Sequence, residues 1–212
     1  MVEQKLTLAK IKKFCWPASL WKRVLAILLA IVLLCLAASY GIAQWYIARH
    51  ANEPLRLGTT FTSDYAQSYG LDPKDTLNAI LGDLNIRQIR LVSYWDRIES
   101  TPGKYDFSNL DWQFAMANQY SAKVSLAIGL RQPRWPECHM PTWALKEPKS
   151  VWQPQLYKFM DAVVSRYKNN PALETYELEN EFFMSVFGTC TDFDRNRLIA
   201  EFKMVKAWDP SR

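Results

Sequence analysis

Glycine, proline, cysteine and histidine are all scarce in this chain of 212 residues. Seven Gly and eleven Pro are too few for a collagen-like, low-complexity or disordered protein. Four Cys exclude a small disulfide-dense domain. Two His and the lack of a CxxC motif argue against a zinc site, although Cys138 stands next to His139. We therefore expect no metal, and a length of this size suits one domain with a sizeable core.

The net positive charge of the chain comes from its N-terminal end. Residues 1–50 contain seven Lys or Arg and one Glu, a net charge of +6, whereas the whole chain carries +5. Residues 51–212 therefore carry −1. Because a nearly neutral domain offers no basic surface to phosphates, we expect no nucleic-acid partner.

A long uncharged segment follows the basic residues. Residues 24–48 contain no Asp, Glu, Lys or Arg, and about 20 apolar residues are enough to cross a bilayer as a helix. Six Lys or Arg precede this segment and only Arg49 closely follows it, so the positive-inside rule puts the N-terminus in the cytoplasm. The sequence predicts a cytoplasmic basic tail at 1–22, a transmembrane signal anchor in the lipid bilayer at 23–48, a linker at 49–54 and an extracytoplasmic domain at 55–212.

A cleaved signal peptide is the alternative to a single-pass anchor. The small residues at 41–43 offer a cleavage site near Ala43, which would release the main domain as a secreted protein. The basic lead of 23 residues is long for a signal peptide, which favours the anchor. Both alternatives export the main domain. An oxidising compartment favours a disulfide between Cys138 and Cys190, with two separate buried thiols as the alternative.

Strand-like and helical runs alternate four times after residue 55. The expected strands are 55–61, 86–95, 123–130 and 173–181, and a long loop at 131–154 separates the third strand from its helix. Such alternation predicts an α/β fold with parallel strands and helical crossovers. No strand is followed by a Gly-rich phosphate loop, so a nucleotide-binding sheet is disfavoured.

Acidic residues collect where the fourth expected strand ends. Glu177, Glu179 and Glu181 alternate along the chain and would share one face of a regular strand. In a (β/α)8 barrel, catalytic groups lie at this end of the strands. An inward-facing acid is costly unless it is paired or functional. Glu181 is therefore a candidate for proton transfer, with a solvated strand-end acid as the alternative, and Glu179 suits an interior partner for Arg90 or Arg131.

Four segments resemble clan A retaining glycoside hydrolases, closest to the β-galactosidase-like family 42 and the cellulase-like family 5. They read RLVSYWDRIESTPGKYDFSNLDW (90–112), GLRQPRWP (129–136), ELENE (177–181) and KAWDPSR (206–212). The similarity as a whole covers residues 55–212. The resemblance implies that this part is the first four β–α units of a (β/α)8 TIM barrel, placed behind a membrane anchor.

The resemblance also implies roles for three residues. Glu181 would be the general acid and base that protonates the glycosidic oxygen and later deprotonates water. Asn180 would hydrogen-bond the sugar 2-hydroxyl, and Arg90 would keep the nucleophilic carboxylate ionised and oriented. On chemical grounds, aromatic rings stack on the apolar faces of sugars, and the third strand end offers a cation. The candidate substrate-binding residues are Trp95, Trp135, Trp143 and Arg131, with packing in the loop core as the alternative for the tryptophans.

In the resembled families the nucleophile is a Glu at the end of the seventh strand, and this sequence supplies only four strands. We therefore expect the N-terminal half of a glycosidase that acts on an extracellular β-linked glycan or galactoside. Alone it would be inactive, because its partner, the missing C-terminal half of the barrel, holds the nucleophile. No cofactor is expected, since two carboxyls and water suffice. The alternative is a membrane-anchored, non-catalytic carbohydrate-binding or cell-envelope protein.

Overall fold

The computed structural model describes residues 19–53 and 56–212. The chain divides into two compact units between Leu55 and Arg56. Most of the predicted cytoplasmic tail, residues 1–18, and the end of the predicted linker, residues 54–55, lie outside the described residues. Each unit is therefore described by itself.

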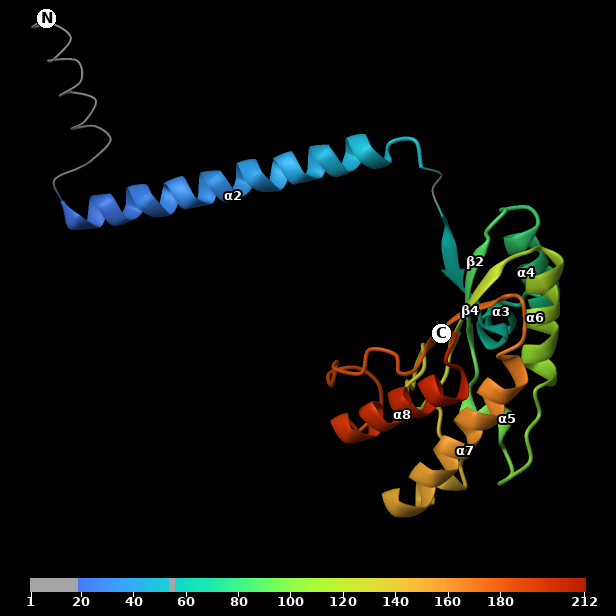
Figure 1. The fold of residues 1–212 in the computed structure, drawn as a ribbon. Coiled ribbons are helices and arrows are strands. Elements are labelled where there is room, and N and C mark those ends of the chain that lie inside the picture. Colours follow the sequence, from blue (N-terminus) through green and yellow to red (C-terminus); the bar gives the residue numbers. More distant parts are fainter. Residues whose placement is uncertain (1–18, 54–55) are drawn as a thin grey trace, which may run out of the picture. The chain divides into compact units, whose positions relative to one another are not determined.

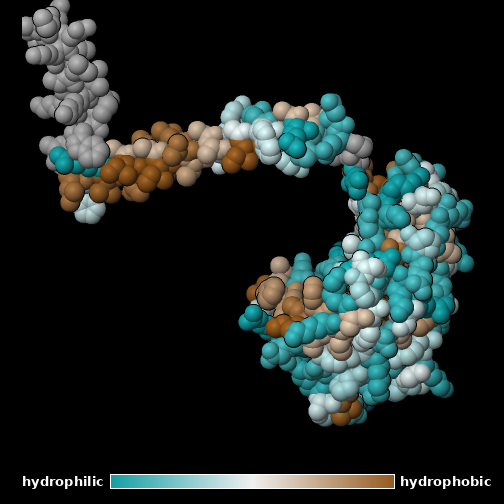
Figure 2. Space-filling model, viewed as in Figure 1, coloured by the Kyte–Doolittle hydropathy of each residue, from teal (hydrophilic) through white to brown (hydrophobic). Residues whose placement is uncertain are grey.

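The first unit contains one long apolar helix, α2 (Leu20–His50). Its 31 residues correspond to about 46 Å at 1.5 Å per residue, which exceeds the hydrocarbon thickness of a bilayer. None of its residues is buried, and apolar surface covers most of its length in Figure 2. The helix is thus long and apolar enough to span a membrane or to serve as a signal anchor. It begins three residues before the predicted span and ends two residues after it.

The second unit is built on a sheet of four parallel strands. Their order is that of the sequence: β1 (Gly58–Thr60), β2 (Gln88–Val92), β3 (Lys123–Ala127) and β4 (Leu173–Glu177). This arrangement confirms the predicted α/β fold with four β–α units. All four strands are shorter than predicted. Beyond β3 and β4, the Glu179 side chain accepts the amide hydrogen bonds of Leu130 and Arg131, both at 2.8 Å, in place of a strand partner.

Helices follow each strand (Figure 1). They are α3 (Ser63–Ser68), α4 (Pro73–Leu81), α5 (Trp95–Ile98), α6 (Ser108–Gln119), a short 3-10 helix (Ala144–Lys146), α7 (Lys149–Tyr167) and α8 (Arg195–Trp208). Asp72 caps α4, because its carboxylate accepts the amide hydrogen bonds of Lys74 and Asp75 at 2.8 and 2.9 Å. The prediction of a loop up to residue 154 was wrong, since α7 begins at Lys149 and contains Pro154.

One face of the sheet packs against helices and the other is polar. Helices α4 and α6 lie side by side against the packed face in Figure 1, and α6 contacts both β2 and β3. Buried side chains of the strands and helices form a single hydrophobic cluster, with fully buried members such as Leu91, Leu126, Leu156 and Phe159. Complete burial of one such side chain contributes about 1.5–3 kcal/mol. The opposite face is a shallow depression that includes Gln88, Arg90 and Ser125.

Candidate functional site

A cleft of about 310 Å³ lies at the carboxyl-terminal ends of the strands. Its walls come from all four β–α units: Tyr65 from α3, Arg90 from β2, the loop after β3 and the loop after β4. This is the rim where barrel enzymes carry their catalytic groups. The lining residues are Tyr65, Arg90, Pro133, Arg134, Trp135, Glu137, Asn180, Glu181 and Phe187.

A chain of polar contacts crosses the floor of this cleft. Arg90 forms an ion pair with Glu177, and its guanidinium also donates to Asn180 Oδ1 at 2.7 Å. The Asn180 amide in turn donates from Nδ2 to Glu137 Oε2 at 2.7 Å. The structure therefore brings together Arg90 and Asn180, two of the predicted site residues, and adds Glu137 to them.

Glu181 lies on the rim of the same cleft. Its side chain is exposed, and its backbone has φ +44°, in the left-handed region that non-glycine residues rarely occupy. The three acids 177, 179 and 181 do not share a face, contrary to the prediction, because β4 ends at Glu177. Glu177 pairs with Arg90, Glu179 turns into the protein interior, and Glu181 meets solvent.

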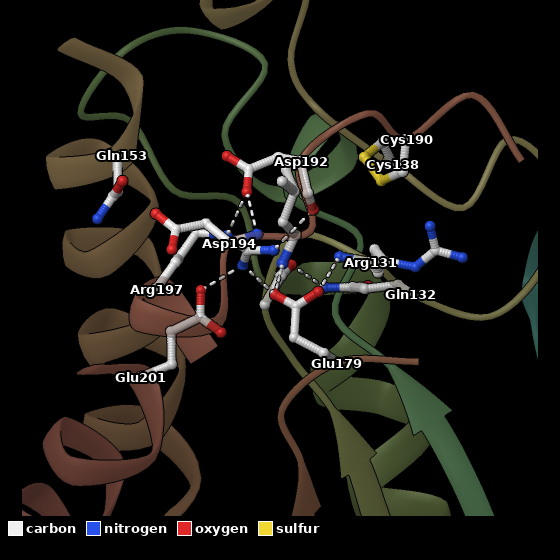
Figure 3. Close-up of polar contacts among 12 residues, drawn as sticks. Arg131, Gln132, Cys138, Gln153, Glu179, Cys190, Asp192, Asp194, Arg197 and Glu201 are labelled. Atoms are coloured by element: carbon white, nitrogen blue, oxygen red, sulfur yellow. Dashed lines mark hydrogen bonds and ion pairs between the residues drawn. A yellow bond between two sulfur atoms is a disulfide. The ribbon is translucent and has the colours of Figure 1, made fainter. Parts of the chain in front are cut away.

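Glu179 belongs to a buried ionic cluster beneath the cleft (Figure 3). Its side chain is 1% exposed and pairs at 2.5 Å with Arg197 of α8, which also pairs at 2.5 Å with Glu201. The predicted partner, Arg90 or Arg131, was wrong for the side chain, although the Arg131 backbone amide binds Glu179. Burial and the neighbouring Glu179 carboxylate raise the pKa of Glu201 to about 9. Glu179 thus links the chain just after β3 and β4 to helix α8.

Arg131 supports the cleft from behind. The sequence predicts that it contacts substrate, but its side chain is fully buried. Its Nε donates to the carbonyl oxygen of Asn180 at 3.1 Å, and its Nη2 donates to that of Met184 at 3.2 Å. The backbone N–H of Asn180 donates in turn to the backbone carbonyl of Arg131 at 2.8 Å. These contacts hold the Asn180–Glu181 backbone against the loop after β3, so Arg131 positions the loop and does not face the cleft.

The three candidate tryptophans have different environments. Trp95 is fully buried, donates from Nε1 to Glu99 Oε2 at 2.6 Å and stacks near Phe159, so neither face of its ring is open to a sugar. Trp143 packs edge-on against Trp95 and donates to the Glu99 carbonyl at 2.9 Å, away from the cleft. Only Trp135 lines the cleft, with 60% of its surface exposed.

A disulfide between Cys138 and Cys190 joins the loops after β3 and β4, with their Cα atoms 5.1 Å apart. This is the pair that the sequence predicts for an oxidising compartment. It fixes Glu137, the residue before Cys138, relative to the loop that carries Glu181. His139 is 8% exposed and stacks on Tyr94, and burial lowers its pKa to about 4, which keeps the imidazole neutral. Among residues 19–53 and 56–212, no three His, Cys, Asp or Glu side chains gather as metal ligands.

Sequence reasoning missed Glu137, Tyr65, Arg134 and Phe187 as members of the cleft. Phe187 lies edge-on to Trp135, with ring centroids 5.9 Å apart, which extends the aromatic wall. The one available signal was the position of Arg134 and Glu137 in a loop after a strand. That signal does not say which loop side chains turn inward.

Comparison with known proteins shows the fold. No protein-family model matches the sequence, and no curated protein matches it. Among solved structures, the chain is similar to the exo-β-1,4-mannosidase Op5Man5 from Opitutaceae bacterium strain TAV5 (13% identity, TM-score 0.59), with 73% of this chain and 30% of that one covered. Native xylanase 10B from Thermotoga maritima (14%, TM-score 0.54) matches 73% of this chain with 46% of its own. Endo-glycoceramidase II from Rhodococcus sp. (18%, TM-score 0.51) matches 71% with 45%.

These similar structures are clan A glycoside hydrolases, and the second unit has the fold of part of their TIM barrel. The resemblance that the sequence indicated is confirmed at the level of the fold. The chain spans less than half of the length of each of the three structures.

Proposed function

We propose that residues 56–212 are the N-terminal part of a retaining glycoside hydrolase that acts on an extracytoplasmic β-linked glycan. The observation that carries the proposal is the hydrogen-bonded chain of Arg90, Asn180 and Glu137, with Glu181 on the rim of the same cleft. It lies at the strand ends of a fold shared with glycoside hydrolases. Because fold alone does not fix function, the residues in this cleft must supply the argument.

The proposed reaction uses two carboxyl groups. Glu181 protonates the glycosidic oxygen while a nucleophilic carboxylate attacks the anomeric carbon, which forms a covalent glycosyl-enzyme and releases the alcohol. Glu181 then removes a proton from water, which displaces the enzyme carboxylate with net retention. The nucleophile would come from outside the four β–α units described above and would lie about 5–5.5 Å from Glu181.

The surroundings suit these roles. Arg90 reaches the floor of the cleft, where a guanidinium stabilises an ionised carboxylate. The Asn180 amide has one N–H beyond that given to Glu137 and borders the cleft, so it can donate to a sugar hydroxyl. The exposed Trp135 ring offers an apolar face for stacking.

Helix α2 is proposed as the membrane anchor of this enzyme. It is long and apolar enough to span a bilayer, and the excess of Lys and Arg before residue 24 favours a cytoplasmic N-terminus. This topology places the cleft outside the cytoplasm, where the Cys138–Cys190 disulfide persists. Cleavage near Ala43 would release the same domain outside the cytoplasm as a secreted protein.

The test is an activity assay of the longest polypeptide that the reading frame encodes, produced in membranes and given two sets of aryl β-glycosides, one with good and one with poor leaving groups. Glu181→Ala should lower kcat/KM on glycosides with poor leaving groups by about 10²- to 10⁴-fold, the usual contribution of a general acid and base. Azide should restore turnover of the aryl substrate and yield a β-glycosyl azide, because a small anion needs no general base to attack the glycosyl-enzyme. The matched control is Glu174→Ala, on the exposed part of β4.

Full activity of Glu181→Ala would refute the assignment of the acid and base. Binding of oligosaccharides by the wild-type protein without any turnover would favour the alternative, a non-catalytic carbohydrate-binding protein. If the wild-type protein neither binds nor hydrolyses glycosides, both the glycosidase proposal and the carbohydrate-binding alternative are refuted.

A further inference from the structure

Glu137 is a buried acid in the wall of the cleft. The side chain is 2% exposed, and Oε2 accepts the hydrogen bond of Asn180 Nδ2 at 2.7 Å. The fully buried Arg131 guanidinium lies 3.6 Å from the same oxygen. A buried carboxyl needs such partners, since an unpaired charge in the interior is costly. Glu137 is therefore held by a cation and an amide at the point where the loops after β3 and β4 meet.

The backbone of Glu137 is strained, and its surroundings enforce the strain. Its φ is +71°, and two other residues that line the cleft, Arg134 and Glu181, also have positive φ. Such conformations cost free energy and persist only where the structure determines them. Here the Glu137 amide donates to the Arg134 carbonyl at 2.8 Å, and the Glu137 carbonyl accepts from the Gln132 amide at 2.8 Å. A Cβ at Gly188 would lie 2.7 Å from Glu137 Cβ, so only glycine allows this close approach.

The position of Glu137 decides which way the Asn180 amide faces. On one side, Arg90 donates to Oδ1, and on the other, Glu137 accepts from Nδ2. A rotation of the amide by 180° would place its oxygen against a carboxylate and its NH2 group against a guanidinium, and both contacts would be repulsive. The two charged neighbours therefore select one orientation. In that orientation Nδ2 keeps one further proton, the donor that Asn180 can offer to the cleft.

We propose that Glu137 is a positioning residue that fixes the Asn180 amide so that its free N–H is presented to a ligand oxygen in the cleft. The hydrogen bond and the amide orientation stand on the geometry alone, whereas the benefit to glycoside cleavage rests on the function proposed above. The groups around the Glu137 carboxyl are Asn180 and the charges of Arg131, Arg90 and Glu181. The pKa of Glu137 is raised, and burial is the main cause. The hydrogen bond from Asn180 and the charge of Arg131 act in the opposite direction.

The first test observes the Asn180 side chain and needs no activity. The full chain is placed in lipid nanodiscs with asparagine labelled at the side-chain nitrogen, and the Asn180 NH2 signals are assigned from their loss in Asn180→Asp. One of the two protons should resonate downfield and exchange slowly because it is bonded to a buried carboxylate. This signal should titrate with a midpoint above the usual pKa of Glu.

Glu137→Leu removes the acceptor, and it should shift the bonded proton upfield and abolish the titration. Glu137→Gln keeps an acceptor oxygen without the charge, so it should shift the proton part of the way and also abolish the titration. The matched control is Glu147→Gln, on an exposed loop residue, which should leave the signals unchanged. If Glu137→Leu fails to fold, Glu137→Gln decides the question. Asn180 signals that are identical in Glu137→Gln and wild type, or that do not titrate, would overturn the proposal.

The second test applies to the longest encoded polypeptide. Glu137→Gln should lower kcat on aryl β-glycosides by about 10- to 100-fold with a smaller change in KM, because one charge-assisted hydrogen bond that orients a transition-state contact is weakened. A general loss of stability would instead lower the amount of active enzyme and leave kcat per active site unchanged. Absence of turnover in the wild type would refute the proposed function, while the amide signals would still decide the role of Glu137.

Discussion

The ionic cluster under the cleft predicts an unusual dependence of stability on pH. Arg197 is the one guanidinium shared by Glu179 and Glu201, and all three side chains are at most 1% exposed. One buried cation compensates one buried carboxylate, so a second ionised carboxylate would lack a counter-charge. Figure 3 shows both acids turned toward Arg197. For this reason Glu201 retains a proton in the folded chain, with its pKa raised to about 9.

The sign and the size of the effect follow from linkage. The folded chain binds a proton on Glu201 up to about pH 9, whereas the unfolded chain releases it near the usual value for Glu, about 4.3. Stability from this group is fully present below the unfolded pKa and is lost as the pH rises toward the folded pKa. One proton corresponds to about 1.4 kcal/mol per pH unit, so the ceiling between pH 6 and pH 8 is about 3 kcal/mol.

The variant Glu201→Gln replaces the neutral acid by a neutral amide of the same shape. Its free energy of unfolding should therefore approach that of the wild type near pH 5 and exceed it progressively toward pH 9. The measurement is denaturant unfolding of the full chain in detergent micelles, followed by tryptophan fluorescence at pH 5, 6, 7, 8 and 9. Glu174→Gln, an exposed acid on β4, is the control and should keep a constant difference from the wild type.

Parallel pH profiles for Glu201→Gln and wild type between pH 6 and pH 8 would refute the reasoning, because they would mean that folding does not change the proton count at this residue. Glu179→Gln provides a second check. Removal of the neighbouring charge should flatten the pH dependence, while loss of an ionised acceptor for the Leu130 and Arg131 amides should lower stability at every pH.

Two further predictions concern the disulfide and the two tryptophans that follow strands β2 and β3. The double variant Cys138→Ser, Cys190→Ser removes a crosslink that spans 52 residues. Its free energy of unfolding should be lower by about 4 kcal/mol in the chain-entropy estimate. Equal urea midpoints for the variant and the oxidised wild type would contradict the structural role of the disulfide. Trp95→Ala should lower the free energy of unfolding by about 3–5 kcal/mol because it empties a fully buried site. Trp135→Ala should change stability little and weaken oligosaccharide binding measured by calorimetry. Equal stability losses for the two variants would be inconsistent with the burial of the two side chains.

The fold was predictable because each β–α unit carries its own local signal. The alternation of apolar residues and the Asp72-Pro73 helix start are short-range patterns, and the observed sheet order follows from four such units in succession. Element ends were less predictable. The predicted loop ends at Pro154, yet α7 starts five residues earlier and includes this proline. A helix start is decided by packing of the whole amphipathic face, including the buried Trp152, and one proline does not override it.

The aromatic residues show a different limit. Trp95 and Trp135 both follow a strand and both fit a sugar-stacking role by residue type. The structure buries the first against Phe159 and exposes the second in the cleft. An indole is large and apolar with one polar N–H, so it suits a core position with a hydrogen-bond acceptor as well as a binding surface. For Trp95 that acceptor is Glu99, four residues along the chain, and nothing in the local pattern indicates whether this pair faces in or out.

Asn180 and Glu181 could be predicted as cleft residues because they stand at a strand end and the segment ELENE resembles a glycoside hydrolase motif. Glu137 could not, because its role depends on a hydrogen bond to a residue 43 positions away and on a backbone turn that Gly188 permits from the opposite loop. The regular alternation of acids after residue 176 predicts three carboxyls on one face of a strand. That expectation fails because the strand ends at Glu177, and the three acids then meet a guanidinium of the sheet, a buried guanidinium of α8 and solvent. The second acid of this cleft comes from the neighbouring loop, so its discovery requires the long-range contacts that only the folded chain supplies.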